Sequence, residues 1–491
     1  MVRGLVTDAD GGEPLAACAV TLGSRSVQAD ADGRFFFNVP DGSYTLKAAY
    51  VGYKPFSAVL ELRADTSVVI RMQPAQISLR EVTITAKEST GMTSSSRIDK
   101  AAMRHLQPSS FTDLLELVPG NISENPDMGS VNSIRMRETG NISASGSRSD
   151  NADYAMSSLG TLFNMDGVPI NNDANLQSTG IEAATGRNAM NRGVDMRTLS
   201  TDNIESVEIV RGIPSAEYGN LSSGMVDIRR TRRPTPLSAR FKADGYSKLF
   251  FAGKGISIKD HSLNADAGYL DSKVDPRNNL ENFKRINASL RGAFHWESRT
   301  SITDWSIAAD FNGTIDRAKS DPDISLVKID EYKSSSRRYS LTSGLTFSFP
   351  TVSWLEKLQV NTSAAYQYDR LTRRRQVAPS RAVVAPVSSE EGVHDGAFIL
   401  GEYIADYLSE GRPLNLYAKI GIAGNAPLAM LSNRWKAGAD WSFSKNYGRG
   451  QVYDPLRPLT ASWTSRPRAF SEIPALNLVS AYAEDVAQMP I

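Results

Sequence analysis

The side chains that could carry catalysis or bind a metal are few and scattered along the chain. There is one cysteine, Cys18, and there are four histidines, His105, His261, His295 and His394. A single cysteine excludes an internal disulfide and a cysteine-based zinc site. The sequence holds no zinc-binding H-E-x-x-H, no phosphate-binding G-x-x-x-x-G-K and no nucleophile elbow G-x-S-x-G. We therefore predict no catalytic residue, no metal, no cofactor and no enzymatic activity.

Hydrogen-bonding side chains gather instead in two long polar stretches, at residues 138–158 and 171–197. Asn, Ser, Asp and Arg dominate these stretches, and such side chains suit oriented hydrogen bonding to a polar ligand. Compact domains seldom keep loops of this length without a function, although loops that only fill space would have the same composition. The residues that we expect to contact a ligand are Ser147, Arg148, Asp150, Asn151, Asn171, Asn172, Asp173, Asn175 and Arg187.

The whole-chain composition limits what these stretches can be attached to. The chain has 491 residues, of which 41% are apolar and 22% charged, so two to four folded domains are expected. Its net charge of +1 gives no reason to expect nucleic acid as a partner. No run approaches the roughly 20 apolar residues of a membrane-spanning helix. The basic clusters at 229–233 and 373–375 are best explained as solvated turns or lipid-headgroup contacts.

The first 73 residues predict a small β-sandwich. Gly-Gly or Asp-Gly turn signals occur at residues 11–12, 32–33 and 41–42. Between them lie β-forming runs at 19–22, 34–39, 44–48 and 68–72, and about seven strands at this spacing make a sandwich. A Ser- and Thr-rich connector follows at 74–97. It contains one short alternating β-former run, which an ordinary linker or strand end would also explain: Glu81, Val82, Thr83, Ile84, Thr85 and Ala86.

Residues 98–233 mix helix and strand. Ser110 and Asp113 form a capping-box pattern, and Phe111 and Leu114 begin an apolar helix face that ends before Pro119. Strands are expected at 133–137, 162–166 and 204–211. The mixed composition predicts a compact α/β domain that carries both polar stretches.

The second half alternates apolar and polar residues, as in runs 305–315, 339–349, 358–369 and 435–443. About eleven such runs between 237 and 486 are long enough for tilted transmembrane strands of about 9–11 residues. Trp305, Tyr368 and Trp441 stand where an interfacial aromatic girdle would lie. A large soluble sheet with one wet face is the alternative for any single run.

Several stretches resemble a known family in the order in which that family has them. The segments at 113–120, 163–170, 202–212, 215–220 and 223–228 resemble the plug domain of TonB-dependent outer-membrane receptors. The first 46 residues resemble a carboxypeptidase regulatory-like domain, which implies no peptidase activity, and the run 81–86 resembles the TonB box. The plug-motif residues are Asp166, Gly167, Val168, Pro169, Glu205, Glu208, Arg211, Gly212, Tyr218, Gly219 and Gly224.

The resemblance implies a mainly β architecture. We expect a β-sandwich at 1–74, a linker with the TonB box at 75–97, a mixed α/β plug at 98–233 and part of a transmembrane barrel at 234–491. Barrels of this kind have about 22 strands, so the chain is expected to hold roughly half of one, with an export signal before it and further strands after it. Ile307, Leu345 and Trp441 are expected to be exposed on the convex face of an open half-barrel. Glu205, Glu208, Arg211 and Glu217 are candidates for ion pairs between plug and barrel wall.

The function implied is active import of an extracellular ligand across the outer membrane, driven by the TonB energy-coupling protein of the inner membrane. An iron chelate, a cobalamin, an oligosaccharide and a peptide all remain candidate ligands. The N-terminal domain would be periplasmic, and outer-membrane lipids and a surface lipoprotein are candidate partners. A signal-transducing receptor of the same architecture and a surface carbohydrate-binding or adhesion protein are the alternatives.

Overall fold

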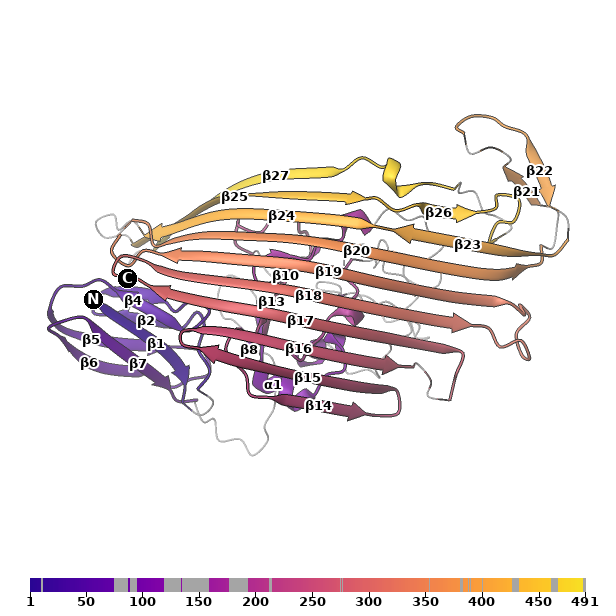
Figure 1. Cartoon of the computed structure of the whole chain (residues 1–491). Coiled ribbons are helices and arrows are strands. Elements are labelled where there is room, and N and C mark those ends of the chain that lie inside the picture. Colours follow the sequence, from indigo (N-terminus) through magenta and orange to yellow (C-terminus); the bar gives the residue numbers. More distant parts are fainter. Residues whose placement is uncertain are drawn as a thin grey trace.

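The computed structural model describes residues 1–9, 12–74, 87–88, 95–118, 134, 159–175, 193–211, 214–273, 275, 277–352, 354–379, 383–386, 388, 390–399, 401–425, 432–460 and 467–488. Three parts follow one another along the chain (Figure 1). A small all-β domain lies at one end of a sheet of long strands, and a mixed domain lies against one face of that sheet. We call the mixed domain the plug and the long-stranded sheet the wall.

The N-terminal domain is the predicted sandwich. Its strands are β1 (Val2–Asp8), β2 (Ala19–Leu22), β3 (Arg25–Gln28), β4 (Arg34–Phe37), β5 (Gly42–Ala49), β6 (Phe56–Leu62) and β7 (Thr66–Met72). They form a three-stranded sheet β4-β1-β7 and a four-stranded sheet β3-β2-β5-β6. Alternate side chains from both sheets, including Val6, Phe35 and Leu46, fill one core. Gly33 takes a φ of +75° in the Asp-Gly turn, where a Cβ would stand 2.5 Å from the carbonyl oxygen of Val6.

The plug is built on a six-stranded sheet in the order β11-β10-β13-β12-β9-β8. Its elements are β8 (Lys87–Glu88), β9 (Ser95–Asp99), α1 (Lys100–Leu106), η1 (Phe111–Leu117), β10 (Thr161–Met165), β11 (Val168–Pro169), η2 (Asp173–Asn175), η3 (Met196–Thr198), β12 (Ile204–Val210) and β13 (Gly224–Arg230). The Ser110–Asp113 capping box is present, but it starts a 3-10 helix. Phe111, Leu114, Phe163 and Val207 pack in its core.

The wall is a twelve-stranded sheet. Its strands are β14 (Ser238–Ala243), β15 (Ser247–Ile258), β16 (His261–Ser272), β17 (Glu281–Glu297), β18 (Ile302–Lys319), β19 (Asp330–Ser348), β20 (Lys357–Val377), β23 (Tyr403–Gly411), β24 (Pro413–Asn425), β25 (Ser432–Asn446), β26 (Gly450–Tyr453) and β27 (Leu476–Gln488). Outside the sheet lie the hairpin of β21 (Val383–Pro386) with β22 (Gly396–Ile399), and η4 (Phe470–Glu472). All wall pairings are antiparallel, and β14 and β27 stand at the two ends of the described sheet.

The predicted alternation is confirmed, and it sorts the two faces of the wall by polarity. Leu290 is 58% exposed and Leu341 is 50% exposed on the face away from the plug. On the other face of β17, Asn287, Ser289 and Arg291 are buried. Of the three residues expected on the convex face, Trp441 is exposed, whereas Ile307 and Leu345 are half-buried. Among the described residues, no helix is long and apolar enough to span a membrane.

Candidate functional site

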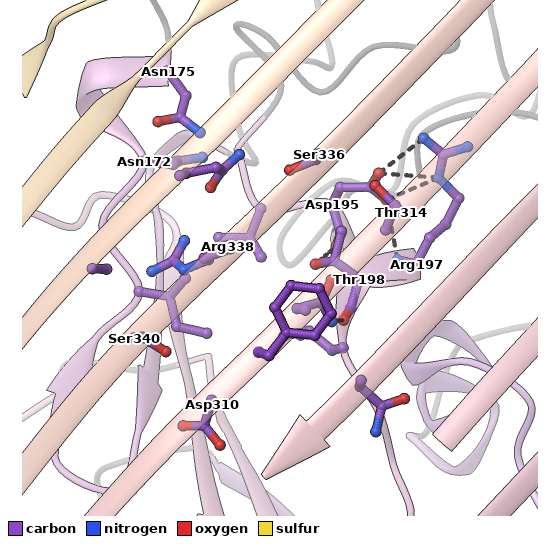
Figure 2. A pocket seen from close by; sticks show the side chains of 18 of the residues that line it. Asn172, Asn175, Asp195, Arg197, Thr198, Asp310, Thr314, Ser336, Arg338 and Ser340 are labelled. Carbon is purple, nitrogen blue, oxygen red and sulfur yellow. Dashed lines mark hydrogen bonds and ion pairs between the residues drawn. The ribbon is translucent and has the colours of Figure 1, made fainter. Parts of the chain in front are cut away.

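A cavity of about 270 Å³ lies between the plug and the wall (Figure 2). The plug contributes residues from the segment after β11 and from the segment around η3. The wall contributes residues of β17, β18, β19, β20 and β23. Because side chains alternate along a strand, every second residue of β19 reaches this cavity. These residues are Ser334, Ser336, Arg338, Ser340 and Thr342.

One buried arginine ties the plug to β18 beside the cavity. Arg230, the last residue of β13, is 5% exposed. Its Nε lies 2.6 Å from Asp166 Oδ2, and its Nη1 lies 2.6 Å from Asp310 Oδ1 on β18. Ser289 Oγ on β17 also donates to Asp310 Oδ1, at 2.6 Å. Arg230 is therefore held between one plug carboxylate and one wall carboxylate.

The Asp-Gly turn explains why Asp166 reaches Arg230. Asp166 and Gly167 are the two loop residues of the β10–β11 hairpin, with φ of +53° and +87°. Positive φ at both positions is what a tight type I′ hairpin requires, and Asp-Gly is a preferred pair for it. Asp166 Oδ1 accepts from the backbone N–H of Arg230 at 2.9 Å. Burial raises the pKa of Asp166, but the charges of Arg230 and Arg232 and the hydrogen bonds from Arg230 together outweigh burial and hold this pKa below its ordinary value.

A second buried arginine makes the same kind of bridge. Arg197 in η3 lies 2.9 Å from Asp195 Oδ2 in the plug and 3.3 Å from Asp316 Oδ2 on β18. Its guanidinium also stands 4.6 Å from the ring centroid of Phe283 on β17. Burial would lower the pKa of Arg197, but Asp195 and Asp316 outweigh burial and raise it, so the guanidinium stays charged.

Wall side chains also hold the backbone around η3. Arg285 Nη1 on β17 donates to the carbonyl oxygens of Arg197 and Leu199, at 2.8 and 2.9 Å. Asn312 Nδ2 on β18 donates to the carbonyl oxygen of Thr198. The segment is thus fixed by ion pairs through its side chains and by hydrogen bonds through its main chain.

The plug meets the wall again at β24, β25 and β27. Glu217 lies 3.5 Å from Lys419 Nζ and 3.4 Å from Lys436 Nζ. Burial raises the pKa of Glu217, but the two ammonium charges outweigh it and hold the pKa below its ordinary value. The Glu484 side chain accepts from Ser215 Oγ and from the backbone N–H of Ala216. This second contact region is polar as well.

The predicted ligand residues that the structure describes divide into two pairs. Asn172 and Asn175 line the cavity. Asn171 instead donates to Ser444 Oγ at 2.9 Å, and its side chain accepts from the backbone N–H of Asp173 at 2.8 Å. The predicted residues that lie outside the described part of the chain are Ser147, Arg148, Asp150, Asn151, Arg187, Gly212 and the run 81–86.

The candidates for plug–wall ion pairs are corrected in part. Glu217 pairs with the wall, as expected. Glu205 pairs with Lys100 of the plug at 3.3 Å. Arg211 donates to Ser96 in the neighbouring plug strand, and Glu208 stands between β9 and β13 in the plug sheet. Glu205 and Glu208 lie on β12, and Arg211 follows it. Because β12 is an inner strand of the plug sheet, these side chains contact the plug and not the wall.

The interpretation of the basic cluster 229–233 as solvated turn is wrong for Arg230, because its guanidinium is buried between two carboxylates. Sequence reasoning missed Arg197 and Arg230 as plug anchors. The available signal was the alternation of β18, which puts Asp310 and Asp316 on the same face as Asn312.

The remaining plug-motif residues provide no charged or hydrogen-bonding side chain to the cavity. Val168 and Pro169 form β11 and supply apolar lining to the cavity. The ring of Tyr218 lies 4.9 Å below Lys419 Nζ. Gly224 begins β13, and Gly219 has open space where a Cβ would stand. Within the described residues, no group of three or more His, Cys, Asp or Glu side chains could hold a metal ion.

Solved structures resemble this chain only distantly. The siderophore receptor PiuA from Acinetobacter baumannii shares 12% identity over 83% of this chain and 57% of its own, with a TM-score of 0.44. The ferric preacinetobactin receptor BauA from the same organism shares 9% over 82% and 56%, with a TM-score of 0.42. The ferric-catecholate import receptor Fiu from E. coli K12 shares 12% over 83% and 57%, with a TM-score of 0.46. The chain thus spans a little over half the length of these proteins.

Family comparison is more direct. A search of curated proteins gave no match. The carboxypeptidase regulatory-like domain matches residues 1–92, where the structure has its seven-stranded sandwich. The TonB-dependent receptor plug domain matches residues 86–226, which contain the Asp166–Gly167 turn and strands β9 to β12. The chain therefore contains a carboxypeptidase regulatory-like domain followed by a plug domain of the TonB-dependent receptor type.

Proposed function

We propose that the chain serves active import of a polar ligand across the outer membrane. The ligand enters the cavity between plug and wall, and the energy-coupling protein TonB captures residues 81–86 and pulls on the plug. The observation that carries this proposal is the polar character of the plug–wall contact. At both contact regions the plug is held by ion pairs and hydrogen bonds, through residues such as Arg230, Arg197 and Glu217.

A polar contact suits a plug that must move. Separating apolar surfaces costs about 25 cal/mol for each Å² exposed to water, and nothing in water replaces what is lost. Ion pairs and hydrogen bonds can exchange their partners for water as the plug shifts, so the net loss for each hydrogen bond is about 0.5–1.5 kcal/mol. The buried arginine pairs resist small displacements, and water entering the interface weakens them once movement has begun.

The outward face of the wall supports an outer-membrane location. Leu290, Leu341 and Ile420 are each at least half exposed on that face. A contiguous apolar surface is uncommon on a soluble protein, whereas strands with an apolar outer face and a polar inner face are typical of transmembrane barrels. The sandwich then lies on the periplasmic side, near the β17–β18 turn. There Arg34 Nη1 contacts His295 Nδ1 at 2.6 Å.

Proline substitution in the segment 81–86 tests the coupling step. Thr83→Pro or Ile84→Pro removes the geometry and the donors that strand addition to TonB needs. We expect uptake of the ligand by cells to fall while binding of the ligand at the cell surface persists. Thr83→Val keeps a β-former at the same position and serves as the matched control. Uptake that is unchanged in both proline variants contradicts the proposal.

A further inference from the structure

Some of the charged side chains that line the cavity form ion pairs with one another, and others do not. Arg197 and Arg230 each pair with two carboxylates. Asp195, Asp310 and Asp316, which also line the cavity, are therefore already paired. Arg338 on β19 also lines the cavity. In the described part of the chain, its guanidinium forms no ion pair within 4.0 Å and no hydrogen bond. Arg370 on β20 lines the cavity too, but its side chain is exposed, whereas that of Arg338 is half-buried in the middle of the polar lining.

Arg338 stands in the middle of hydroxyl and amide groups. Ser336 and Ser340 flank it along β19, as Figure 2 shows. In the sheet register it faces Gln367 on β20 and Asn312 on β18. Asp369 follows Gln367 on the same face of β20, and its two carboxylate oxygens each accept from Gln367 Nε2 at 2.8 Å. Asp369 thus accepts from the Gln367 amide and from the Ser336 hydroxyl, and no ion pair within 4.0 Å joins it to Arg338 in the described part of the chain.

This arrangement fits a particular ligand chemistry. A guanidinium presents a planar fork of donors that matches the two oxygens of a carboxylate or phosphate. The hydroxyls of Ser336 and Ser340 can donate to or accept from ligand hydroxyl groups. An ionised Asp369 can only accept, and it lies two residues along β20 from the residue that faces Arg338, so it suits a ligand donor roughly 7 Å from the anionic group. A site built to pair with a charged group also discriminates strongly against a ligand that lacks it.

We propose that Arg338 determines ligand specificity by pairing with an anionic oxygen group, and that the imported ligand carries this group among hydroxyl groups. This inference rests on the proposed function, because it assumes that the cavity is the ligand site. It narrows the candidates to ligands with a carboxylate or phosphate. Arg338 contributes the charge, and Ser336, Ser340 and Asp369 contribute the surrounding hydrogen bonds.

Two matched pairs of small probes test the inference with the purified protein in detergent micelles. Gluconate and sorbitol differ by a carboxylate, and glucose 6-phosphate and glucose differ by a phosphate. Saturation-transfer NMR titrations give the affinity of each probe. A hydrogen bond to a charged group is worth about 1.5–3 kcal/mol, which corresponds to about tenfold to a hundredfold preference for the anionic member. The pair that shows the larger preference identifies the anionic group.

Substitutions at neighbouring positions of β19 localise the effect. Arg338→Gln should abolish the preference, and Arg338→Lys should keep part of it because the charge remains. Arg337→Gln removes the same charge on the opposite, exposed face of the strand and should leave the preference unchanged. Equal affinity for both members of each pair in the unaltered protein, or a preference that survives in Arg338→Gln, overturns the inference. Since TonB is absent from this assay, its result is independent of whether the proline variants at 83 and 84 abolish uptake.

Discussion

Replacing Arg230 by methionine should loosen the plug more than any neighbouring charge substitution. The change leaves Asp166 and Asp310 without their counter-charge, with side chains only 12% and 20% exposed. Removing one partner of a buried ion pair costs about 3–5 kcal/mol, because the remaining charge stays buried and uncompensated. At 1.4 kcal/mol for each factor of ten, this corresponds to roughly a hundredfold to a few thousandfold higher population of open plug.

Hydrogen exchange followed by mass spectrometry measures that population directly, strand by strand. Peptides covering β10 and β13 should exchange faster by that factor in Arg230→Met. Arg232→Met is the matched control, since Arg232 is half-buried, acts on Asp166 through its charge alone and forms no ion pair within the described residues. A variant that also carries Asp166→Asn and Asp310→Asn removes the uncompensated charges and should recover much of the protection. Exchange rates in Arg230→Met within threefold of Arg232→Met refute the assignment of Arg230 as an anchor.

Three further predictions follow from single contacts. Burial raises the pKa of the Cys18 thiol to about 11, so a maleimide at pH 8 should label Cys18 only when the sandwich unfolds. The sandwich should also lose stability as the pH rises from about 9 towards 11, because the unfolded chain loses the thiol proton first. Rapid labelling of the folded protein would contradict this. Gly167→Ala should cost about 1–2 kcal/mol in the same exchange assay, because φ is +87° and Asn361 Nδ2 would lie 3.3 Å from the new Cβ, whereas Gly219→Ala should cost little in open space. A short bis-maleimide should bridge the two cysteines of an Arg3→Cys, Glu297→Cys double variant, since the two native side chains form an ion pair. Each single variant is the control. Absence of a bridge in the double variant would show that the sandwich does not contact β17.

Alternation in the sequence was enough to predict the wall, because each wall strand has one polar and one apolar face. The alternating pattern did not predict where the strands begin and end. The alternating run begins at Tyr339, whereas β19 begins at Asp330. The added residues pair with β20 over the full length and are held by charge: Asp330 lies 3.0 Å from Arg373. Strand pairing of this kind depends on a partner far along the chain, and a local pattern does not record it.

The plug was less predictable for the same reason. The seven residues of α1 bury only Ala102 and Met103, too few to show a helical period, and the helix depends on Asp99, whose side chain caps Ala102 N–H. The anchoring role of Arg230 needs Asp166 from one turn and Asp310 from the wall, which are 64 and 80 residues away. The Asp-Gly turn could be predicted from two residues, whereas the contact that gives Asp166 its role could not.

Two neighbouring wall strands divide their inward polar groups between the plug and the cavity. On β18, Asp310 and Asp316 are committed to plug arginines, and Asn312 is committed to the plug backbone. On β19, Arg338 makes no such contact within the described residues. The two strands are hydrogen-bonded in continuous register from Ile302 to Lys319 and therefore move together. Under the proposed mechanism, a pull on the plug breaks the β18 anchors and withdraws Asn172 and Asn175 from the ligand, while Arg338 stays with the wall. A bound anion would then keep its charge partner and lose its plug-side hydrogen bonds first, so its affinity falls in steps as the path opens.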